Sequence, residues 1–444
     1  MSKQLTQSKD LTTGSIYRHL INLAIPASMG MFFNTLYNLT DNWFAGKISD
    51  DALVGLSISS IVFYLFIGLL AGLQNGTSVM VSSELGANKG RALKAVTRNS
   101  MSVGVIFSFI VVLLGLLLAQ ETIDWLSTRD ISRVYAWDYI QILLTGNIGF
   151  AISAVAAGAL MALGDTRSNR NVLVVGFFAN LVLNPLLTFG LNMGVAGLAW
   201  ATLIIKFASA AYLLVILSKR LGFQPRLQFE TPLIIKILKQ VLPASLNFFI
   251  MIVGSLMVTA FVSRFGDYAI AGYSVGLRLE QVLLLPALGL NAAVLAISGQ
   301  NFGAKNYRRI SETYRKAQLL GLSISVICTP AMIFLSPLLL SFFSTQDEII
   351  NTGVQYLRID AFAFFCYVSL FISVATLQAT KQPNFPVIMG FFRQLFLPLL
   401  VNYYLIIVLD YSIIWLFGSV ASIVCLSMVI TLLYTRQQLK KLAI

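Results

Sequence analysis

LAIPASMGMFFNTLYNLTDNWFAG, residues 23–46, is an apolar run with Pro26 near its start and one carboxylate, Asp41, near its end. The run is long enough to cross the hydrocarbon core of a bilayer as a helix. An ionisable side chain inside such a helix is costly unless it faces a partner or a water-filled cavity, so its presence is a hypothesis of function. Asp41 is therefore the first candidate functional residue.

The composition of the whole chain agrees with a span at residues 23–46. Of its 444 residues, 57% are hydrophobic and 11% are charged, and the mean hydropathy is +0.81. These values predict an all-α polytopic membrane protein, because helices satisfy their own backbone hydrogen bonds in lipid. Apolar segments of about 20 or more residues recur along the chain and predict twelve transmembrane helices. Their expected ranges are 16–45, 52–80, 93–119, 132–162, 169–190, 194–217, 233–264, 268–298, 310–343, 347–379, 385–409 and 411–435.

We interpret the net charge of +13 as a consequence of membrane topology, because the basic residues are unevenly distributed between the two sides of the membrane. With the N-terminus in the cytoplasm, most of the 31 Lys and Arg residues fall in cytoplasmic segments. The opposite loops hold four: Lys47, Arg129, Arg133 and Arg264. This bias is the positive-inside pattern. It predicts a multi-pass protein of the cytoplasmic (inner) membrane with both termini in the cytoplasm and no nucleic-acid partner.

The two halves of the chain repeat each other at an offset of 217 residues. The matched pairs are Pro26-Ala27-Ser28 with Pro243-Ala244-Ser245, Gly55 with Gly272, Gly86-Ala87 with Gly303-Ala304, Arg91 with Arg308, Arg98 with Arg315, and Tyr139 with Tyr356. Because six spans return the chain to its starting side, both halves share one orientation. We expect two pseudo-symmetric six-helix bundles: an N-terminal lobe (1–217), a cytoplasmic linker (218–232) and a C-terminal lobe (233–444).

No motif in the chain points to an enzyme or a bound cofactor. An HExxH helix, a GxSxG elbow and clustered His and Cys are all missing from the sequence. Cys328, Cys366 and Cys425 are scattered in or beside spans, so neither a disulfide framework nor a CxxC metal site is supported. We expect a protein that is not an enzyme and needs no cofactor.

Several motifs together resemble the multidrug and toxic compound extrusion (MATE) family over nearly the whole chain. They are the two Pro-Ala-Ser starts, Asp41–Gly46 (DNWFAG), the paired Gly-Ala loops, Leu163–Arg167 (LGDTR), Asn180–Gly190 (NLVLNPLLTFG) and Gly194–Thr202 (GVAGLAWAT). The resemblance implies a V-shaped pair of six-helix lobes, alternating access, and export of amphipathic, often cationic compounds driven by inward flow of H⁺ or Na⁺. Within the family, the chain most resembles the branch named for DNA-damage-inducible protein F, in which the first-helix carboxylate is the coupling acid.

Two features of the sequence depart from other branches of that family. Where archaeal-type members carry a second acid in the fifth span, this chain has Asn184. The seventh span, Val241–Phe265, contains no Glu or Asp, so the C-lobe cation site of the sodium-coupled bacterial branch is not carried over.

The expected cation-coupling residues lie at similar depths in the first lobe. Counting about 1.5 Å per residue, Asp41 lies roughly 8 Å and Tyr139 roughly 9 Å inward from the outer ends of their spans. Thr202 lies roughly 12 Å and Asn180 roughly 15 Å inward, with Asn184 between them. The two asparagines are four residues apart and share a helix face, so both could meet the carboxylate, although ordinary amide bonding between helices is the alternative.

A carboxylate among amides and hydroxyls is expected to favour its neutral form and so to load a proton from outside. Neutralisation would alter hydrogen bonds around the first helix, where Pro26 leaves a carbonyl without its donor and is a candidate hinge. Na⁺ remains open as the coupling ion, because Asp41, Asn180, Asn184 and Thr202 together offer several oxygen ligands.

Five further charged residues form a candidate substrate or charge network. Lys206, one turn past Thr202, is too deep to reach the cytoplasm easily. We expect it to pair with Asp41 in one state, or to contact an anionic substrate group. In the second lobe the within-span charges, two of each sign, are Arg278, Glu280, Asp360 and Arg393. They suggest mutual pairing of buried charges, with a substrate or second proton site as the alternative.

The sequence thus predicts a secondary antiporter for small organic compounds in the lipid bilayer, coupled to H⁺ or Na⁺ through Asp41. A flippase for a lipid-linked precursor is the nearest alternative, and a membrane-embedded transferase is the alternative of a different class. The sequence does not show an oligomeric state, and a monomer is the starting expectation.

Overall fold

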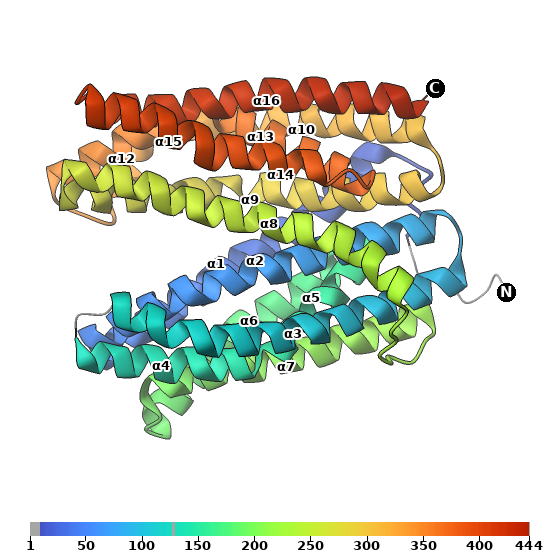
Figure 1. Ribbon diagram of the computed structural model, residues 1–444, viewed down its shortest axis with the longest axis horizontal. Helices are drawn as coiled ribbons and strands as arrows, with labels where there is room; N and C mark the ends of the chain where they lie inside the picture. The colour runs from blue at the N-terminus through green and yellow to red at the C-terminus, as the bar shows by residue number, and fades with distance from the viewer. Residues whose placement is uncertain (1–8, 127–128, 444) are drawn as a thin grey trace. The chain divides into compact units, whose positions relative to one another are not determined.

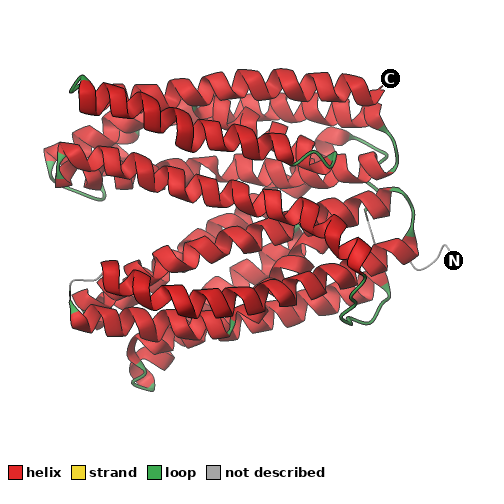
Figure 2. Ribbon diagram, viewed as in Figure 1, coloured by secondary structure: helices red, strands yellow, loops and turns green. Residues whose placement is uncertain are grey.

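The computed structural model describes residues 9–126 and 129–443, and every regular element in these ranges is a helix (Figure 2). The elements of the first half are α1 (Ile16–Ile48), α2 (Asp50–Gly86), α3 (Gly90–Leu126), α4 (Asp130–Thr145), α5 (Asn147–Ala162), α6 (Arg167–Pro185), η1 (Leu186–Gly190) and α7 (Gly194–Leu221). Those of the second half are α8 (Thr231–Val262), η2 (Ser263–Phe265), α9 (Asp267–Gly303), α10 (Tyr307–Phe334), α11 (Ser336–Ser341), α12 (Asp347–Asp360), α13 (Phe364–Ala379), α14 (Asn384–Phe391), η3 (Phe392–Phe396), α15 (Leu397–Asn402), η4 (Tyr403–Val408) and α16 (Ile413–Ala443). Three short elements, η1, η3 and η4, are π-helical.

The number of spans agrees with the sequence prediction. Within the described ranges, 10 helical stretches are long and apolar enough to cross a membrane. Two helix pairs pass the same test as one bent span each, α4 with α5 at 51° and α12 with α13 at 56°. Counting each bent pair as one span gives 12, which confirms the predicted polytopic all-α architecture.

The outer faces of the helices carry large apolar side chains. On α3, Phe109, Leu113 and Leu117 follow one another at i,i+4 spacing and are 69%, 64% and 63% exposed. A soluble protein rarely exposes such a continuous apolar stripe. The stripe is what a helix facing lipid requires.

Each half of the chain is built around its second helix (Figure 1). In the first half, α2 packs against α3, α4 and α5. In the second half, α9 takes the same role against α10, α12 and α13. The last helices correspond as well, since α7 packs on α4 and α5 while α16 packs on α12 and α13.

The repeat of the sequence is also a repeat of backbone geometry. Asn88 and Lys305, 217 residues apart, have φ values of 55° and 56°. A non-glycine residue in this left-handed region is uncommon, so the coincidence reflects two copies of the same turn. Side-chain packing repeats too: a Cβ on Gly55 would meet the carbonyl of Ser132, and a Cβ on Gly272 that of Ile349.

The chain forms two compact units whose boundaries differ from those of the repeat. One unit comprises residues 9–10 and Met29–Leu246, and the other comprises Leu11–Ser28 and residues 247–443. The start of α1 therefore belongs with the second half of the chain, and the start of α8 belongs with the first. Both helices pass from one unit to the other just after their Pro-Ala-Ser sequences.

Close glycine contacts mark both crossing points. Within the first unit, a Cβ on Gly72 would lie 2.0 Å from Ser245 Oγ. Within the second unit, a Cβ on Gly289 would lie 2.0 Å from Ser28 Oγ. No other residue type fits at these two repeat-related positions without movement of the backbone.

Candidate functional site

Two helices of the first unit, α6 and α7, bring polar side chains to Asp41 on α1. Asn180 and Asn184, one turn apart on α6, each donate a side-chain N–H to Asp41 Oδ1 at 2.8 Å. Thr202 on α7 donates its hydroxyl to Asp41 Oδ2 at 3.5 Å. The i,i+4 spacing on α6 and the depth of each residue in its span thus place four of the predicted residues together.

The two asparagines also bond to each other, which fixes their orientation. The Asn180 amide N–H lies 3.3 Å from Asn184 Oδ1, and the Asn184 amide N–H lies 3.1 Å from Asn180 Oδ1. Both side chains are fully buried. As a result their nitrogens face the carboxylate, and their oxygens are already engaged as acceptors.

Two tyrosines complete the surroundings of Asp41. Tyr37, one turn before Asp41 on α1, donates its hydroxyl to Thr202 Oγ1 at 2.9 Å. The predicted Tyr139 on α4 is buried and lies near Asp41, Tyr37 and Thr202. Sequence reasoning missed Tyr37, although its i−4 spacing from Asp41 on a helix was the available signal.

The site has one carboxylate and no tightly bound counter-charge. Asp41 is 5% exposed, and in the described part of the chain no Lys, Arg or His forms an ion pair with it. A buried carboxylate without a counter-charge is destabilised, and it is relieved by a proton or another cation. The hydrogen-bond donors around Asp41 stabilise its charged form when that cation leaves.

Lys206 lies on the same face of α7 as Thr202 but contacts an aromatic ring. Its Nζ is 5.3 Å from the centroid of the Phe150 ring on α5. Among the described residues it makes no ion pair, so the expected direct pairing with Asp41 is not present in this conformation. Lys206 is still close enough for its charge to act on Asp41.

The second unit contains a separate acidic cluster. Glu280 on α9 is buried and accepts a hydrogen bond from the hydroxyl of Tyr356 on α12. Asp360, one turn further along α12, is 4% exposed, and its Oδ2 has no hydrogen-bond partner among the described residues. The two carboxylates interact with each other. Tyr367 on α13 is hydrogen-bonded to Asp360 and also interacts with Arg393 of η3.

The predicted mutual pairing of the four second-lobe charges is not found in the described ranges. Arg278 is exposed and forms no ion pair with either buried acid among the described residues. Arg393 acts on Tyr367 rather than directly on a carboxylate. The structure therefore brings Glu280 and Asp360 together without the two expected arginines.

Pro26 lies inside α1, which continues as one helix from Ile16 to Ile48. Two residues later the helix passes from the second unit to the first. The carbonyl of Ala24 accepts the Ser28 hydroxyl at 3.0 Å, a local bond that adds to the irregularity at this turn. The hinge role of Pro26 stays a prediction.

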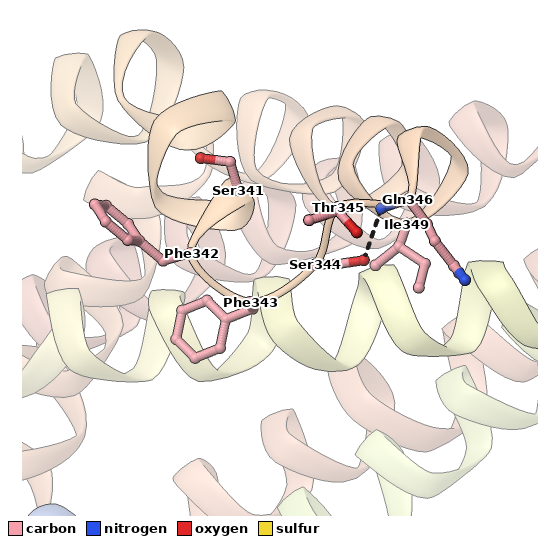
Figure 3. Close-up of a pocket in the computed structure, with 7 residues that line it drawn as sticks. All are labelled: Ser341, Phe342, Phe343, Ser344, Thr345, Gln346 and Ile349. Carbon is pink, nitrogen blue, oxygen red and sulfur yellow. Dashed lines mark hydrogen bonds between the residues drawn. The ribbon is translucent and has the colours of Figure 1, made fainter.

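A shallow pocket elsewhere in the second unit is unrelated to these residues (Figure 3). It is formed by one turn between α11 and α12, with Phe342 and Phe343 on one side and the bond from the Gln346 N–H to Ser344 Oγ on the other. None of the predicted site residues lines it. In the described ranges no group of three His, Cys, Asp or Glu residues is arranged to hold a metal.

Comparison with known proteins gives consistent matches along the chain. A family model described as MatE matches twice, over residues 26–186 and 243–404, at the spacing of the sequence repeat. The chain is 28% identical over 385 residues to the probable multidrug resistance protein NorM of Thermotoga maritima, covering 85% of this chain and 82% of that protein. It is 23% identical over 381 residues to the multidrug export protein MepA of Staphylococcus aureus, covering 84% of each.

Solved structures share the fold. One, described as the outward-facing conformation of a multidrug resistance MATE family transporter of the MOP superfamily, superposes with a TM-score of 0.91 at 20% sequence identity. The match covers 100% of this chain and 99% of the other.

Proposed function

The chain belongs to the MatE family, whose members are transporters and not enzymes, and we propose that it is a proton-coupled antiporter that exports small amphipathic, often cationic organic compounds. Its relatives named as multidrug resistance and multidrug export proteins support the substrate class. The observation that carries the coupling role is the single buried carboxylate of Asp41, held by amide and hydroxyl donors without a tight counter-charge.

The proposed cycle uses the two forms of this carboxylate. When Asp41 is ionised, Asn180 and Asn184 donate to Oδ1 and Thr202 donates to Oδ2. When Asp41 is protonated, its O–H becomes a donor, and the hydroxyl of Thr202 must turn to accept it. The hydrogen bonds between α1, α6 and α7 therefore differ between the two forms, which is the requirement for a two-state element biased by a proton.

Helix α1 is the element that we propose transmits this change. Asp41 lies in the part of α1 that belongs to the first unit, and Pro26 lies in the part that belongs to the second. A proline within a helix removes one backbone hydrogen bond and lowers the cost of bending there. A change at Asp41 can therefore reach the second unit along one continuous helix, with Pro26 as the hinge of alternating access.

The membrane setting follows from the positive-inside pattern, and we propose the cytoplasmic (inner) membrane with both termini in the cytoplasm. The first-helix carboxylate and Asn184 also support placement near the DNA-damage-inducible protein F branch.

Reconstitution into liposomes tests this function. A fluorescent lipophilic cation serves as the transported probe, and either a pH gradient or a Na⁺ gradient is imposed. We expect the native chain to export the probe under the pH gradient, and Asp41→Asn to lose at least about tenfold of that rate, because the neutral amide cannot exchange a proton. Asp124→Asn is the matched control, since that carboxylate is exposed at the end of α3.

Three outcomes would contradict the proposal. Native rates in Asp41→Asn would remove the coupling role of this carboxylate. Movement of a lipid-linked precursor, with neither gradient driving the cation, would favour a flippase. Formation of a chemical product independent of any gradient would favour an enzyme.

A further inference from the structure

The position of Lys206 is set by close packing of α7 against the bend between α4 and α5. The two helices meet at Gly146 at an angle of 51°. A Cβ on Gly146 would lie 2.4 Å from a methyl carbon of Leu203, so α7 packs directly on the bend at this glycine. Lys206 follows Leu203 by three residues and is thereby held over Phe150, four residues after the bend.

The ring of Phe150 is itself fixed by a second aromatic side chain. Phe63 of α2 packs against it at 5.4 Å between centroids, at an interplanar angle of 74°. Phe150 is buried, so the face offered to the ammonium group is a desolvated one. A cation over such a face is stabilised, whereas a neutral amine gains little.

Helix geometry and the lack of a direct ion pair indicate how far this ammonium group lies from the carboxylate. Thr202 Oγ1 lies 3.5 Å from Asp41 Oδ2, and Lys206 is one turn further along the same face of α7. One turn of helix rises about 5.4 Å, and among the described residues Lys206 forms no ion pair with Asp41. We therefore take the separation of the two charges as on the order of 8 Å. The site therefore holds one negative and one positive group that do not touch.

We infer that Lys206 helps to keep Na⁺ out of the Asp41 site, an inference that rests on the antiport proposed above. A proton bonds covalently to one carboxylate oxygen and needs no further ligands. A hard metal ion needs several oxygens at once. Here the nearest amide groups turn their nitrogens to Asp41 and use their oxygens for each other.

Charge and ligand orientation act in the same direction. A fixed positive charge about 8 Å away weakens the binding of any monovalent cation on the order of 30-fold at an effective dielectric constant of about 20. A covalent O–H bond withstands this loss, whereas a Na⁺ ion that also lacks oxygen ligands does not. To bind Na⁺, both Asn180 and Asn184 would in addition have to rotate and give up their mutual bonds. Asp41, Asn180 and Asn184 together carry four side-chain oxygens. All four already accept hydrogen bonds, so they are less available as Na⁺ ligands than their number suggests.

Na⁺ binding to the purified full-length chain, measured without transport, is the primary test. Thermal stability is compared in NaCl and in choline chloride at equal ionic strength, and uptake of radioactive sodium by the purified protein is measured in parallel. We expect the native chain to show no Na⁺-specific shift. Lys206→Gln, which removes the charge and adds an amide oxygen, should bind Na⁺ more than about 30-fold more tightly than the native chain. Lys206→Met, which removes only the charge, should show the gain of about 30-fold without the contribution of the added oxygen.

Transport under a Na⁺ gradient gives the second readout. We expect Lys206→Gln to acquire probe export driven by the Na⁺ gradient, and Lys206→Arg to remain indifferent to Na⁺ because its charge is retained. Lys47→Gln is the matched control: Lys47 also lies over an aromatic ring, 5.4 Å from Trp43, but at the end of α1. This variant should gain no Na⁺ response.

The inference is overturned if the native chain binds Na⁺ specifically, or if Lys206→Gln and Lys206→Met remain indifferent to Na⁺ while keeping native thermal stability. A native chain that exports the probe under neither gradient contradicts the proposed antiport instead. In that case the Na⁺-binding measurement still decides the role of Lys206.

Discussion

Tyr37 ends a short chain of hydroxyl groups that leads to the carboxylate of Asp41. Its O–H donates to Thr202 at 2.9 Å, and Thr202 in turn donates to Asp41. In Tyr37→Phe the Thr202 hydroxyl loses this donor, at a net cost of about 1 kcal/mol. We therefore expect probe export driven by a pH gradient to fall about 2- to 10-fold in this variant.

Tyr212→Phe is the control for Tyr37→Phe, because Tyr212 lies on α7 and is 44% exposed. Equal initial rates for both variants in proteoliposomes would show that the Tyr37 hydroxyl has no part in coupling.

The sequence was informative about Asp41, Asn180, Asn184 and Thr202 because polar side chains are rare in spans and their depth can be counted. It could not indicate that Lys206 contacts Phe150. An aromatic ring on another helix leaves no local pattern around the lysine, and opposite charge alone suggested Asp41 as its partner. For the same reason the charges of Arg278 and Glu280, two residues apart on α9, suggested a shared network, whereas residues at this spacing point in different directions on a helix.

At the scale of elements, the length of each apolar segment predicted the continuous helices, but it did not predict the breaks within two of the spans. The fourth span bends at Gly146, but the tenth bends over residues 361–363, where the sequence is Ala-Phe-Ala. Apolar composition continues across both bends, so hydropathy alone predicts one continuous helix for each of these two spans. The π-helical segments η1 and η4 occupy matching places in the two repeats, and a hydrogen-bond shift of this kind has no composition signal.

The contact between α9 and the start of α1 leads to a prediction about stability. A Cβ on Gly289 would lie 2.0 Å from Ser28 Oγ and 2.5 Å from the carbonyl oxygen of Ala24. Because the second contact is with backbone, Gly289→Ala cannot be accommodated by rotating one side chain. We expect it to lower the stability of the folded protein by about 1–3 kcal/mol, seen as a lower thermal transition in detergent.

Gly418→Ala, within α16, is the matched control. A Cβ at Gly418 would meet nothing within 4 Å, and alanine favours the helix over glycine by about 0.5–1 kcal/mol. This variant should be as stable as the native chain or slightly more stable. A Gly289→Ala protein that melts with the control would show that α1 and α9 are not packed as described.

For the molecule as a whole, the 217-residue offset predicted the order of helices and the paired turns, but it did not predict which segments form each compact unit. A repeat records similarity between positions, whereas a unit is defined by contacts. Leu11–Ser28 resembles the segment that begins α8, yet each of these segments packs with the opposite half of the chain. Both crossings fall directly after a Pro-Ala-Ser sequence, so the exchange of segments occurs once in each repeat.

Two copies of a six-span unit in one orientation must place equivalent loops on the same side of the membrane. Lys89 and Lys305 lie in equivalent exposed turns beside further basic residues, so both are expected in the cytoplasm. Asn192 and Ser412 lie in exposed turns at the other ends of the spans, where residues 191–193 and 409–412 contain no Lys or Arg.

Single cysteines at these four positions, in a chain with Cys328, Cys366 and Cys425 replaced by Ala, test the topology with a membrane-impermeant maleimide. Asn192→Cys and Ser412→Cys should be labelled on intact cells, and Lys89→Cys and Lys305→Cys only after permeabilisation. Reversed labelling would contradict the orientation inferred from charge, and labelling of only one member of either pair on intact cells would contradict the parallel repeat itself.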